Sequence, residues 1–171
     1  SLDNCNKCHA FLSLHGGNRN TIGQCVICHN PVENDRARRP AAAMPPQSID
    51  MRMMVHRIHT GEELTYSYSI YGFGNVEHNY NEVRYPGDRR NCTACHVNNS
   101  QQLPAPAGAL PVQDQRGLIN PVGPESAACL SCHTTVYAAS HALANTTQLG
   151  ESCAACHGPN AEFSVNRVHA R

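Results

Sequence analysis

The sequence contains few of the large apolar side chains that normally fill a protein core. Leucine, isoleucine, valine and phenylalanine account for only 30 of its 171 residues, and tryptophan is absent. This proportion is typical of chains that bury too little apolar surface to offset the entropy lost on ordering. The high net charge of such chains is also missing, because 13 basic and 13 acidic residues cancel. The core must therefore come from something other than the protein's own side chains.

Long apolar runs and extended basic regions are lacking as well. No stretch is long enough to span a membrane as a helix, and the sequence shows no signal peptide. The only dense basic cluster is Arg36, Arg38 and Arg39. These arginines either lie in a solvated loop or pair with carboxylates of a cofactor. We therefore expect no membrane span in this chain and no nucleic acid partner.

Cysteine, in contrast, is abundant and regularly arranged. Every cysteine belongs to one of five copies of Cys-x-x-Cys-His, which are Cys5, Cys8 and His9; Cys25, Cys28 and His29; Cys92, Cys95 and His96; Cys129, Cys132 and His133; and Cys153, Cys156 and His157. This motif is the attachment signature of haem c, with two thioether bonds to the porphyrin and one histidine on the iron. On one helical turn these three residues share a face, so a single turn can hold one haem.

Other uses of these cysteines do not account for the pattern. Zinc ribbons need two cysteine pairs for each metal and have no use for a histidine after each pair. A disulfide framework has no reason to repeat one motif five times. The sequence therefore predicts five covalently attached haem c groups. At one haem for about every 34 residues, they supply the missing core.

The fold expected from this composition is mostly irregular, with short α-helices and one small β-hairpin organised around a stacked haem core. We expect one pentahaem cytochrome c domain over residues 1–171, largely unfolded without haem. A helix should begin with Ser48 as N-cap and end before Gly61. Alternation over residues 64–70 predicts a strand that pairs with residues 76–85. Residues 103–124 should be irregular, and helices should resume at Ser126, run through the fourth motif and continue around His141.

Six histidines lie outside the motifs, and they are His15, His56, His59, His78, His141 and His169. They suffice to complete bis-histidine ligation of five irons, with one to spare. His56 and His59 are three residues apart, so on a helix they cannot bind opposite faces of one iron but can serve two haems on either side of it. Methionine is the competing ligand, but packing against the porphyrins explains the nearby Met51, Met53 and Met54.

Several segments together resemble a known family. They are CNKCHAFLSLHGGNR, CVICHNP, MMVHRIHTGEEL, VRYPGDRRNCTACH, ESCAACHG and NRVHAR. Over nearly the whole chain they are similar to a pentahaem domain of the decahaem outer-membrane cytochromes of the OmcA/MtrC type. The resemblance implies that His15, His56, His59, His141 and His169 are the five distal ligands and that the haems are closely stacked. It also implies a location at the cell surface, and His78 has no counterpart.

Three functions fit these observations. The first is an electron conduit in extracellular or periplasmic respiration, which exchanges electrons with other multihaem cytochromes, redox proteins, minerals or electrodes. The second is a subunit of a self-assembled cytochrome nanowire, in which His78 or His169 ligates iron of the next subunit. The third is a reductase of nitrite, hydroxylamine or sulfur oxyanions, which requires an iron with an open position. Covalent haem attachment occurs outside the bacterial cytoplasmic membrane, so the protein is expected to be exported. It is either a stand-alone cytochrome or one half of a longer chain.

Overall fold

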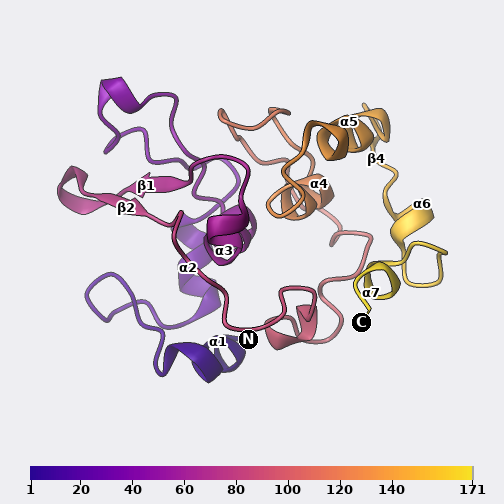
Figure 1. Ribbon diagram of the computed structural model, residues 1–171, viewed down its shortest axis with the longest axis horizontal. Helices are drawn as coiled ribbons and strands as arrows, with labels where there is room; N and C mark the ends of the chain where they lie inside the picture. Colours follow the sequence, from indigo (N-terminus) through magenta and orange to yellow (C-terminus); the bar gives the residue numbers. More distant parts are fainter. Residues whose placement is uncertain (171) are drawn as a thin grey trace.

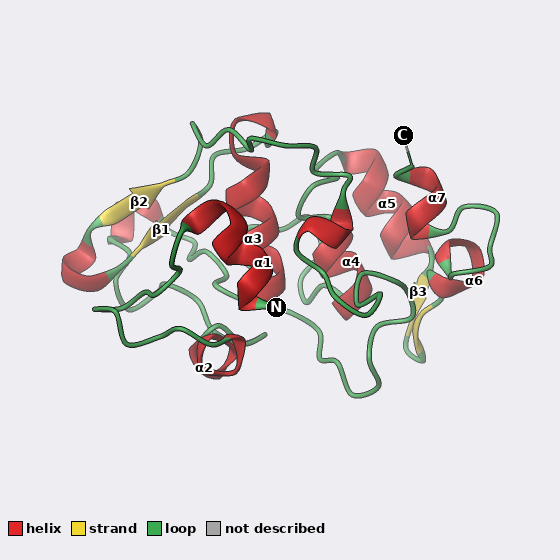
Figure 2. Ribbon diagram, turned by 90° about the horizontal axis from the view of Figure 1, so that it is seen from below, coloured by secondary structure: helices red, strands yellow, loops and turns green. Residues whose placement is uncertain are grey.

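The computed structural model describes residues 1–170 and consists mainly of loops that connect short helices (Figure 2). The α-helices are α1 (Leu2–His9), α2 (Ile22–Cys28), α3 (Met51–Thr60), α4 (Pro124–Cys129), α5 (Val136–Ala144), α6 (Ala154–His157) and α7 (Val165–Val168). Single 3-10 turns are η1 (Ala41–Ala43), η2 (Gly61–Glu63), η3 (Phe73–Asn75) and η4 (Cys92–Ala94). Two antiparallel hairpins pair β1 (Ser69–Tyr71) with β2 (Glu77–Asn79) and β3 (Thr146–Thr147) with β4 (Gly150–Glu151). The expected fold class, an irregular chain with short helices and a small hairpin, is confirmed.

Helix α3 occupies the middle of the molecule. In both ribbon views it lies between the β1–β2 hairpin and α4, while α5, α6 and α7 lie at the end away from the hairpin (Figures 1 and 2). Helices α1 and α2 lie on the hairpin side of the molecule (Figure 1). In both views the N-terminus lies near the middle of the molecule, and the C-terminus lies on the side of α5, α6 and α7 (Figures 1 and 2).

The start of α3 differs from the expectation that Ser48 is its N-cap. The cap is Asp50, whose Oδ1 accepts hydrogen bonds from the backbone N–H groups of Arg52 at 3.0 Å and Met53 at 3.2 Å. The Ser48 hydroxyl instead accepts from the Asp50 N–H at 3.3 Å and supports the cap from outside the helix. The negative charge of this carboxylate also stabilises the helix, because it lies at the positive end of the helix dipole.

Gly61 ends α3, as the sequence predicts. Its φ of +50° lies in the left-handed region, and a Cβ built on it would lie 2.0 Å from the carbonyl oxygen of Val83. The next residue, Glu62, donates its N–H to that same carbonyl at 3.1 Å. Only glycine allows the chain after β2 to approach the end of α3 this closely.

The predicted hairpin exists but is shorter than expected. Only three residues in each strand pair, with Ile70 opposite His78 at the centre. One reason is that the Asn81 side chain accepts the N–H of Tyr68 at 2.6 Å, so this N–H is not available to a longer ladder. The alternation in residues 64–70 instead reflects the burial of Tyr68, which is fully enclosed.

Residues 103–123 are irregular, as predicted, apart from an isolated bridge between Val112 and Val122. Helix α4 begins at Pro124 and not at Ser126. Proline suits the first turn of a helix, because the N–H that it lacks would have no partner within the helix there. The carboxylate of Glu151 accepts the backbone N–H groups of Glu125 at 2.7 Å and Ser126 at 2.8 Å. The helix stops at Cys129, and α5 starts separately, so the continuous helix expected toward His141 does not form.

The protein's own core is small. Among the residues described, its central cluster is formed by Met53, Val112, Val122 and Ala127. Large apolar side chains elsewhere are exposed, and Phe73 and Leu149 are 91% and 101% accessible. The cluster ties α3 to α4 and to the irregular segment before α4, and it leaves the surroundings of the five motifs without an apolar protein core.

Two buried ion pairs compensate for the small core by connecting distant segments. Arg39 binds both carboxylate oxygens of Asp35, at 2.9 and 3.0 Å, and donates to the Ser69 carbonyl at 2.6 Å, which ties the loop before α3 to β1. Arg57 of α3 binds Asp114 at 2.5 Å, with side chains only 3% and 1% exposed. Arg57 also lies against the ring of Tyr68. This second pair attaches α3 to residues 103–123.

Removing one partner of the Arg57–Asp114 pair should destabilise the protein strongly. In the variant Asp114→Asn, Arg57 remains buried without a counter-charge, and we expect a loss of about 3–5 kcal/mol in the free energy of unfolding. Chemical denaturation of the holoprotein, followed by far-UV circular dichroism, measures this loss. Glu62→Gln removes the exposed partner of Arg84 and should change stability little. Equal effects of the two variants would contradict the assigned role of the buried pair.

Candidate functional site

Each Cys-x-x-Cys-His motif forms one helical turn. The first motif lies within α1, and in the other four the histidine N–H donates to the carbonyl of the first cysteine at 2.8–2.9 Å. This holds even for the third motif, which lies in η4 and not in an α-helix. The two sulfurs and the imidazole of each motif therefore project from one face of one turn, whatever structure surrounds it.

The regular helices cover the last two motifs only in part. In the fourth motif, α4 ends at Cys129, so Cys132 lies beyond the helix. In the fifth motif, Cys153 is the N-cap of α6, and Cys156 lies inside that helix. The expectation that a helix runs through the fourth motif is therefore wrong. The single turn closed by the histidine N–H is what all five motifs share.

The second cysteine of every motif is exposed on the surface of the chain. These five residues are Cys8, Cys28, Cys95, Cys132 and Cys156. The first cysteine is half-buried in four motifs, and Cys129 of the fourth motif is exposed. An exposed cysteine has room beside its turn for a covalently attached group.

Every motif histidine lies opposite a second histidine. The ring centres are 6.0 Å apart in the pairs His9–His59, His15–His29, His56–His96 and His133–His169, and 6.1 Å apart in His141–His157. The planes of the two rings differ by 15° in the His56–His96 pair and by 87° in the His141–His157 pair. The five second histidines are the five that the family resemblance implies. The structure adds which motif each of them faces.

Helix α3 contributes to two of these pairs. His56 faces His96 of the third motif, and His59 faces His9 of the first motif. Their spacing of three residues directs the two rings to different neighbours, in keeping with the interpretation that they serve two separate sites. Helix α3 thus lies between the first and third motifs.

His15 reaches its partner through a strained turn. Its φ is +53°, and Gly16 follows with a φ of +77°. Leu14 and Arg19 exchange two backbone hydrogen bonds, at 3.1 and 3.2 Å, across the base of this turn. A left-handed conformation is unusual for histidine and is found where the surrounding structure imposes it. Here it brings His15 opposite His29.

Hydrogen bonds hold several of the paired rings in place. The Nδ1 atoms of four histidines lie within hydrogen-bond distance of backbone carbonyls, which are Ile49 for His29 at 2.9 Å, Val55 for His59 at 2.8 Å, Phe163 for His157 at 2.8 Å and Val165 for His169 at 2.8 Å. When Nδ1 carries the proton and donates to a carbonyl, Nε2 is left free to bind a metal. These bonds orient the rings toward the midpoint of each pair.

Burial favours the neutral form of some of these histidines. It lowers the pKa of His56 to about 4, helped by the neighbouring His96. The pKa of His96 is also lowered by burial, and that of His133 by burial and by its partner His169. A neutral imidazole is the form that binds a metal, so these rings are kept competent as ligands.

All ten motif cysteines are free of disulfide bonds. Desolvation by the surrounding protein raises the pKa of the accessible Cys129 to about 11 and that of Cys153 to about 12, with further contributions from Glu125 and Glu151. Reactive cysteines have a lowered pKa, because the thiolate is the nucleophile. Cys129 and Cys153 therefore lack this feature of a reactive thiol.

The paired histidines have the geometry of an iron site within a porphyrin. Two imidazoles that bind one metal from opposite sides, each through a nitrogen about 2 Å away, place their ring centres about 6 Å apart. Within residues 1–170, no three His, Cys, Asp or Glu side chains come together to hold a metal ion. Two axial ligands suffice for haem, since the porphyrin supplies the other four. Exposed apolar side chains beside the paired histidines fit a flat apolar group, and they include Leu14, Val26, Ile27, Val97 and Val168.

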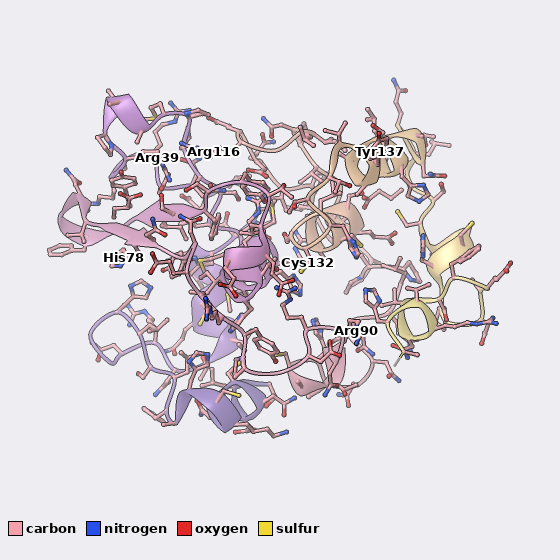
Figure 3. The ribbon with its side chains drawn as sticks, in the orientation of Figure 1. Arg39, His78, Arg90, Arg116, Cys132 and Tyr137 are labelled. Atoms are coloured by element: carbon pink, nitrogen blue, oxygen red, sulfur yellow. The ribbon has the colours of Figure 1, made fainter. Side chains whose placement is uncertain are left out.

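His78 and Met53 are not among the paired residues. His78 is exposed on β2, and its ring lies over Gly72. In Figure 3 it lies on the hairpin side of the molecule, away from Cys132. Met53 is buried in the central apolar cluster and does not face a motif histidine. His169 faces His133 of its own chain, which leaves it poorly placed to serve a neighbouring subunit.

The first three motifs adjoin one another around α3. Asn4 of α1 donates to the carbonyl of Cys95 at 3.2 Å, which joins the first motif to the third. Tyr85 lies at the same junction. Its ring is 5.7 Å from that of His59, and its pKa is raised by burial and by the adjacent Cys95 and Cys8. The second motif meets the start of α3, where Met51 donates its N–H to the carbonyl of its histidine at 3.0 Å.

The remaining motifs continue the series in the other direction. Thr60 at the end of α3 lies 3.1 Å from the sulfur of Cys132, so the fourth motif meets the helix that also carries the histidines opposite the first and third motifs. Glu125 and Glu151 both act on Cys129 and Cys153, which places the fourth and fifth motifs side by side. The first, third, fourth and fifth motifs thus adjoin in that order, and the second motif joins them at the start of α3.

Sequence reasoning did not identify the residues that orient the rings. Ser100 lies 3.0 Å from Nδ1 of His96, and it is four residues beyond that histidine. The backbone carbonyls that bind the other rings carry no signal in the sequence, because any residue can supply a carbonyl. Among these partners only Ser100 could have been suggested by the sequence, because it lies four residues after His96.

Over residues 1–170 the chain matches the family described as outer membrane cytochrome MtrC/MtrF-like, domains II/IV. The chain belongs to this family. It is also similar to the crystal structure of the outer membrane decaheme cytochrome OmcA, with 30% identity over 99% of this chain and a TM-score of 0.59. It spans 23% of the length of that protein. No curated protein matches the chain.

Membership in the MtrC/MtrF-like family identifies the chain as a domain of a multihaem c-type cytochrome with covalently attached haem. Outer membrane cytochromes of this family are electron-transfer proteins. No helix within residues 1–170 has the length and apolar character needed to cross a membrane.

Proposed function

We propose that this MtrC/MtrF-like domain holds five haem c groups, one at each motif, and conducts electrons between them in extracellular or periplasmic respiration. The observation that carries the proposal is the pairing of all five motif histidines with a second histidine at 6.0–6.1 Å. The distal ligands are His59, His15, His56, His169 and His141, in the order of the five motifs. The thioether links are to the ten motif cysteines, which are Cys5, Cys8, Cys25, Cys28, Cys92, Cys95, Cys129, Cys132, Cys153 and Cys156.

The chain's own residues do three things in this proposal. The cysteines hold each porphyrin against one helical turn. The paired histidines occupy both axial positions, and the carbonyls behind them keep the ring nitrogens aimed at the iron. Each haem iron, when bound, cycles between the ferric and ferrous states and so carries one electron.

The order in which the motifs adjoin supports conduction from one end of the domain to the other. Asn4 and Tyr85 join the first motif to the third, and Thr60 joins the fourth motif to α3, so the groups that these motifs hold are close together. We take the second and fifth motifs as the two ends of the series. At these ends we propose exchange with other multihaem cytochromes or with extracellular acceptors such as minerals and electrodes. We also propose that the protein is exported to the cell surface or periplasm.

The pairing favours a conduit over a reductase. A catalytic metal needs an open coordination position, whereas each motif histidine of this chain has a second imidazole opposite it. We further propose that residues 1–171 act as one pentahaem domain, either alone or as part of a longer cytochrome. His78 remains available for contacts between subunits, and the nanowire function depends on self-assembly of this kind.

The haem count is tested by mass. Properly matured protein should carry five covalent haems, measured by intact mass spectrometry and by the pyridine haemochrome assay. A Cys→Ser double variant at a single motif, such as Cys153→Ser with Cys156→Ser, should remove one haem and lower the soluble yield, because the haems replace a protein core. Four or fewer haems in fully matured protein would refute the count.

The ligand assignment is tested by single substitutions. His15→Ala should leave one iron five-coordinate, and it should therefore produce one high-spin signal and bind carbon monoxide in the ferrous state. His78→Ala is the matched control, since this histidine is also exposed and faces no motif, and it should leave all irons low-spin. An open iron in His78→Ala, or in the unmodified protein, would contradict the assignment.

The conduit function is tested by protein-film voltammetry. The domain should show a broad, reversible and non-catalytic envelope at negative potentials, because bis-histidine ligation favours low potentials and adjacent haems shift one another. A steep catalytic wave on addition of nitrite, hydroxylamine or tetrathionate would instead favour a reductase. The same envelope in protein that sediments as filaments would favour the nanowire.

A further inference from the structure

The His56–His96 pair differs from the other four in the hydrogen bonds behind its rings. In each of the other pairs, one histidine has a backbone carbonyl within 2.8–2.9 Å of its Nδ1. In this pair, Nδ1 of His96 meets only the hydroxyl of Ser100, at 3.0 Å. Nδ1 of His56 is enclosed and has no hydrogen-bond partner among the residues described. The Arg52 carbonyl, one turn back, lies nearby but outside hydrogen-bonding geometry.

The same pair is also the most enclosed. Both His56 and His96 are half-buried, whereas each of the other pairs includes one exposed histidine. Its motif lies in the middle of the series, in contact with the first motif through Asn4 and with α3 through the His56 ring. The iron site between these rings is therefore the least accessible to water in the array.

Ser100 is brought behind His96 by a specific turn. Asn98 and Asn99 have φ values of +52° and +57°, which is the left-handed conformation that asparagine tolerates better than most residues. The N–H of Ser100 then donates to the carbonyl of Val97 at 3.0 Å. The hydroxyl is thereby held at Nδ1 of His96 by backbone geometry.

Both features act on the reduction potential in the same direction. A strong hydrogen bond from Nδ1–H makes the imidazole a better electron donor, which stabilises the ferric state and lowers the potential. Burial disfavours the ferric haem, because its iron carries an extra positive charge in a medium of low dielectric constant. A site with weak hydrogen bonds and a buried ligand pair is therefore more easily reduced than its neighbours.

We propose that the iron held by His56 and His96 is the first in the array to accept an electron, and that Ser100 is the residue that sets its potential. This inference rests on the proposed five bis-histidine sites. It makes the central site the place where a single electron resides, with sites of lower potential on both sides. Ser100 acts through His96 and is a positioning residue for the ligand.

The ring angles provide a way to follow this iron. Ferric bis-imidazole haems with nearly parallel rings give a rhombic EPR signal, and crossed rings give a more anisotropic one. The His56–His96 rings are within 15° of parallel, and the His15–His29 rings come next at 30°. The other three pairs are crossed by 55° to 87°. In a reductive titration of the holoprotein, the signal of the most nearly parallel pair should disappear first.

Substitutions at Ser100 identify that signal and test the role of the hydroxyl. Ser100→Asp places a stronger acceptor at Nδ1 of His96 and should make this one site at least about tenfold harder to reduce, a shift of about 59 mV. Ser100→Ala removes the acceptor and should shift the same site in the opposite direction, while Ser100→Thr should restore the original potential. Ser152→Ala is the control, because that hydroxyl donates to the Asn145 carbonyl beside the fifth motif and has no histidine partner.

The outcomes separate this inference from the proposed function. Five low-spin EPR signals establish the bis-histidine array independently of the order of reduction. With five signals present, the inference is overturned if the signal that responds to Ser100→Asp is not the first to disappear. It is also overturned if no single site responds to the Ser100 variants. Fewer than five low-spin signals would instead contradict the proposed ligation itself.

Discussion

The separation of about 6 Å between paired imidazole rings is the constraint around which this chain is arranged. Each pair joins a motif histidine to a histidine that is distant in sequence or lies across a turn, and the intervening segments must bring the two rings face to face. A carbonyl or hydroxyl behind the ring then fixes its direction in every pair. The loops and helices of this MtrC/MtrF-like domain together hold all five pairs of imidazole rings at this separation.

The small protein core follows from the same constraint. Space between the segments is reserved for the proposed haems, and in the part of the chain that the structure describes the buried apolar cluster is the one around Met53. Buried ion pairs take over the task of joining distant segments, and the Arg57–Asp114 pair is the most informative example. Arg57 lies on α3 between His56 and His59, so the pair that anchors the helix also positions two of the five proposed distal ligands. Stability and ligand geometry are therefore coupled at this helix.

The path between sites depends on contacts that cross the chain. Tyr85 stands between the first and third motifs, and Thr60 brings the fourth motif to α3. The motifs consequently do not adjoin simply in sequence order, because the third motif adjoins the first and the second lies at the start of α3. In an electron conduit the order of sites decides where electrons enter and leave. The hydrogen bonds behind each ring decide how readily each site is reduced.

Much of the chemistry of this protein could be predicted from local sequence. The five motifs, the supply of six further histidines and the poverty of apolar residues follow from short spacings and composition. The helix that ends at Gly61 and the position of the hairpin were also predictable. The starts of the helices were harder to predict. Asp50 and not Ser48 caps α3, because its carboxylate reaches the first N–H groups of the helix. Helix α4 starts at Pro124 and not at Ser126, because proline is tolerated in a first turn.

The sequence by itself determined the number and kind of attachment sites, since one helical turn places two cysteines and a histidine on one face wherever it occurs. Only the tertiary structure decided which distal histidine faces which motif, because those rings meet across long loops whose path no local spacing encodes. It also decided the acceptor behind each ring, which is in most cases a backbone carbonyl and therefore independent of residue type. The spacing of residues determines local geometry, whereas packing, turns and buried ion pairs together determine which residues distant in sequence lie opposite each other.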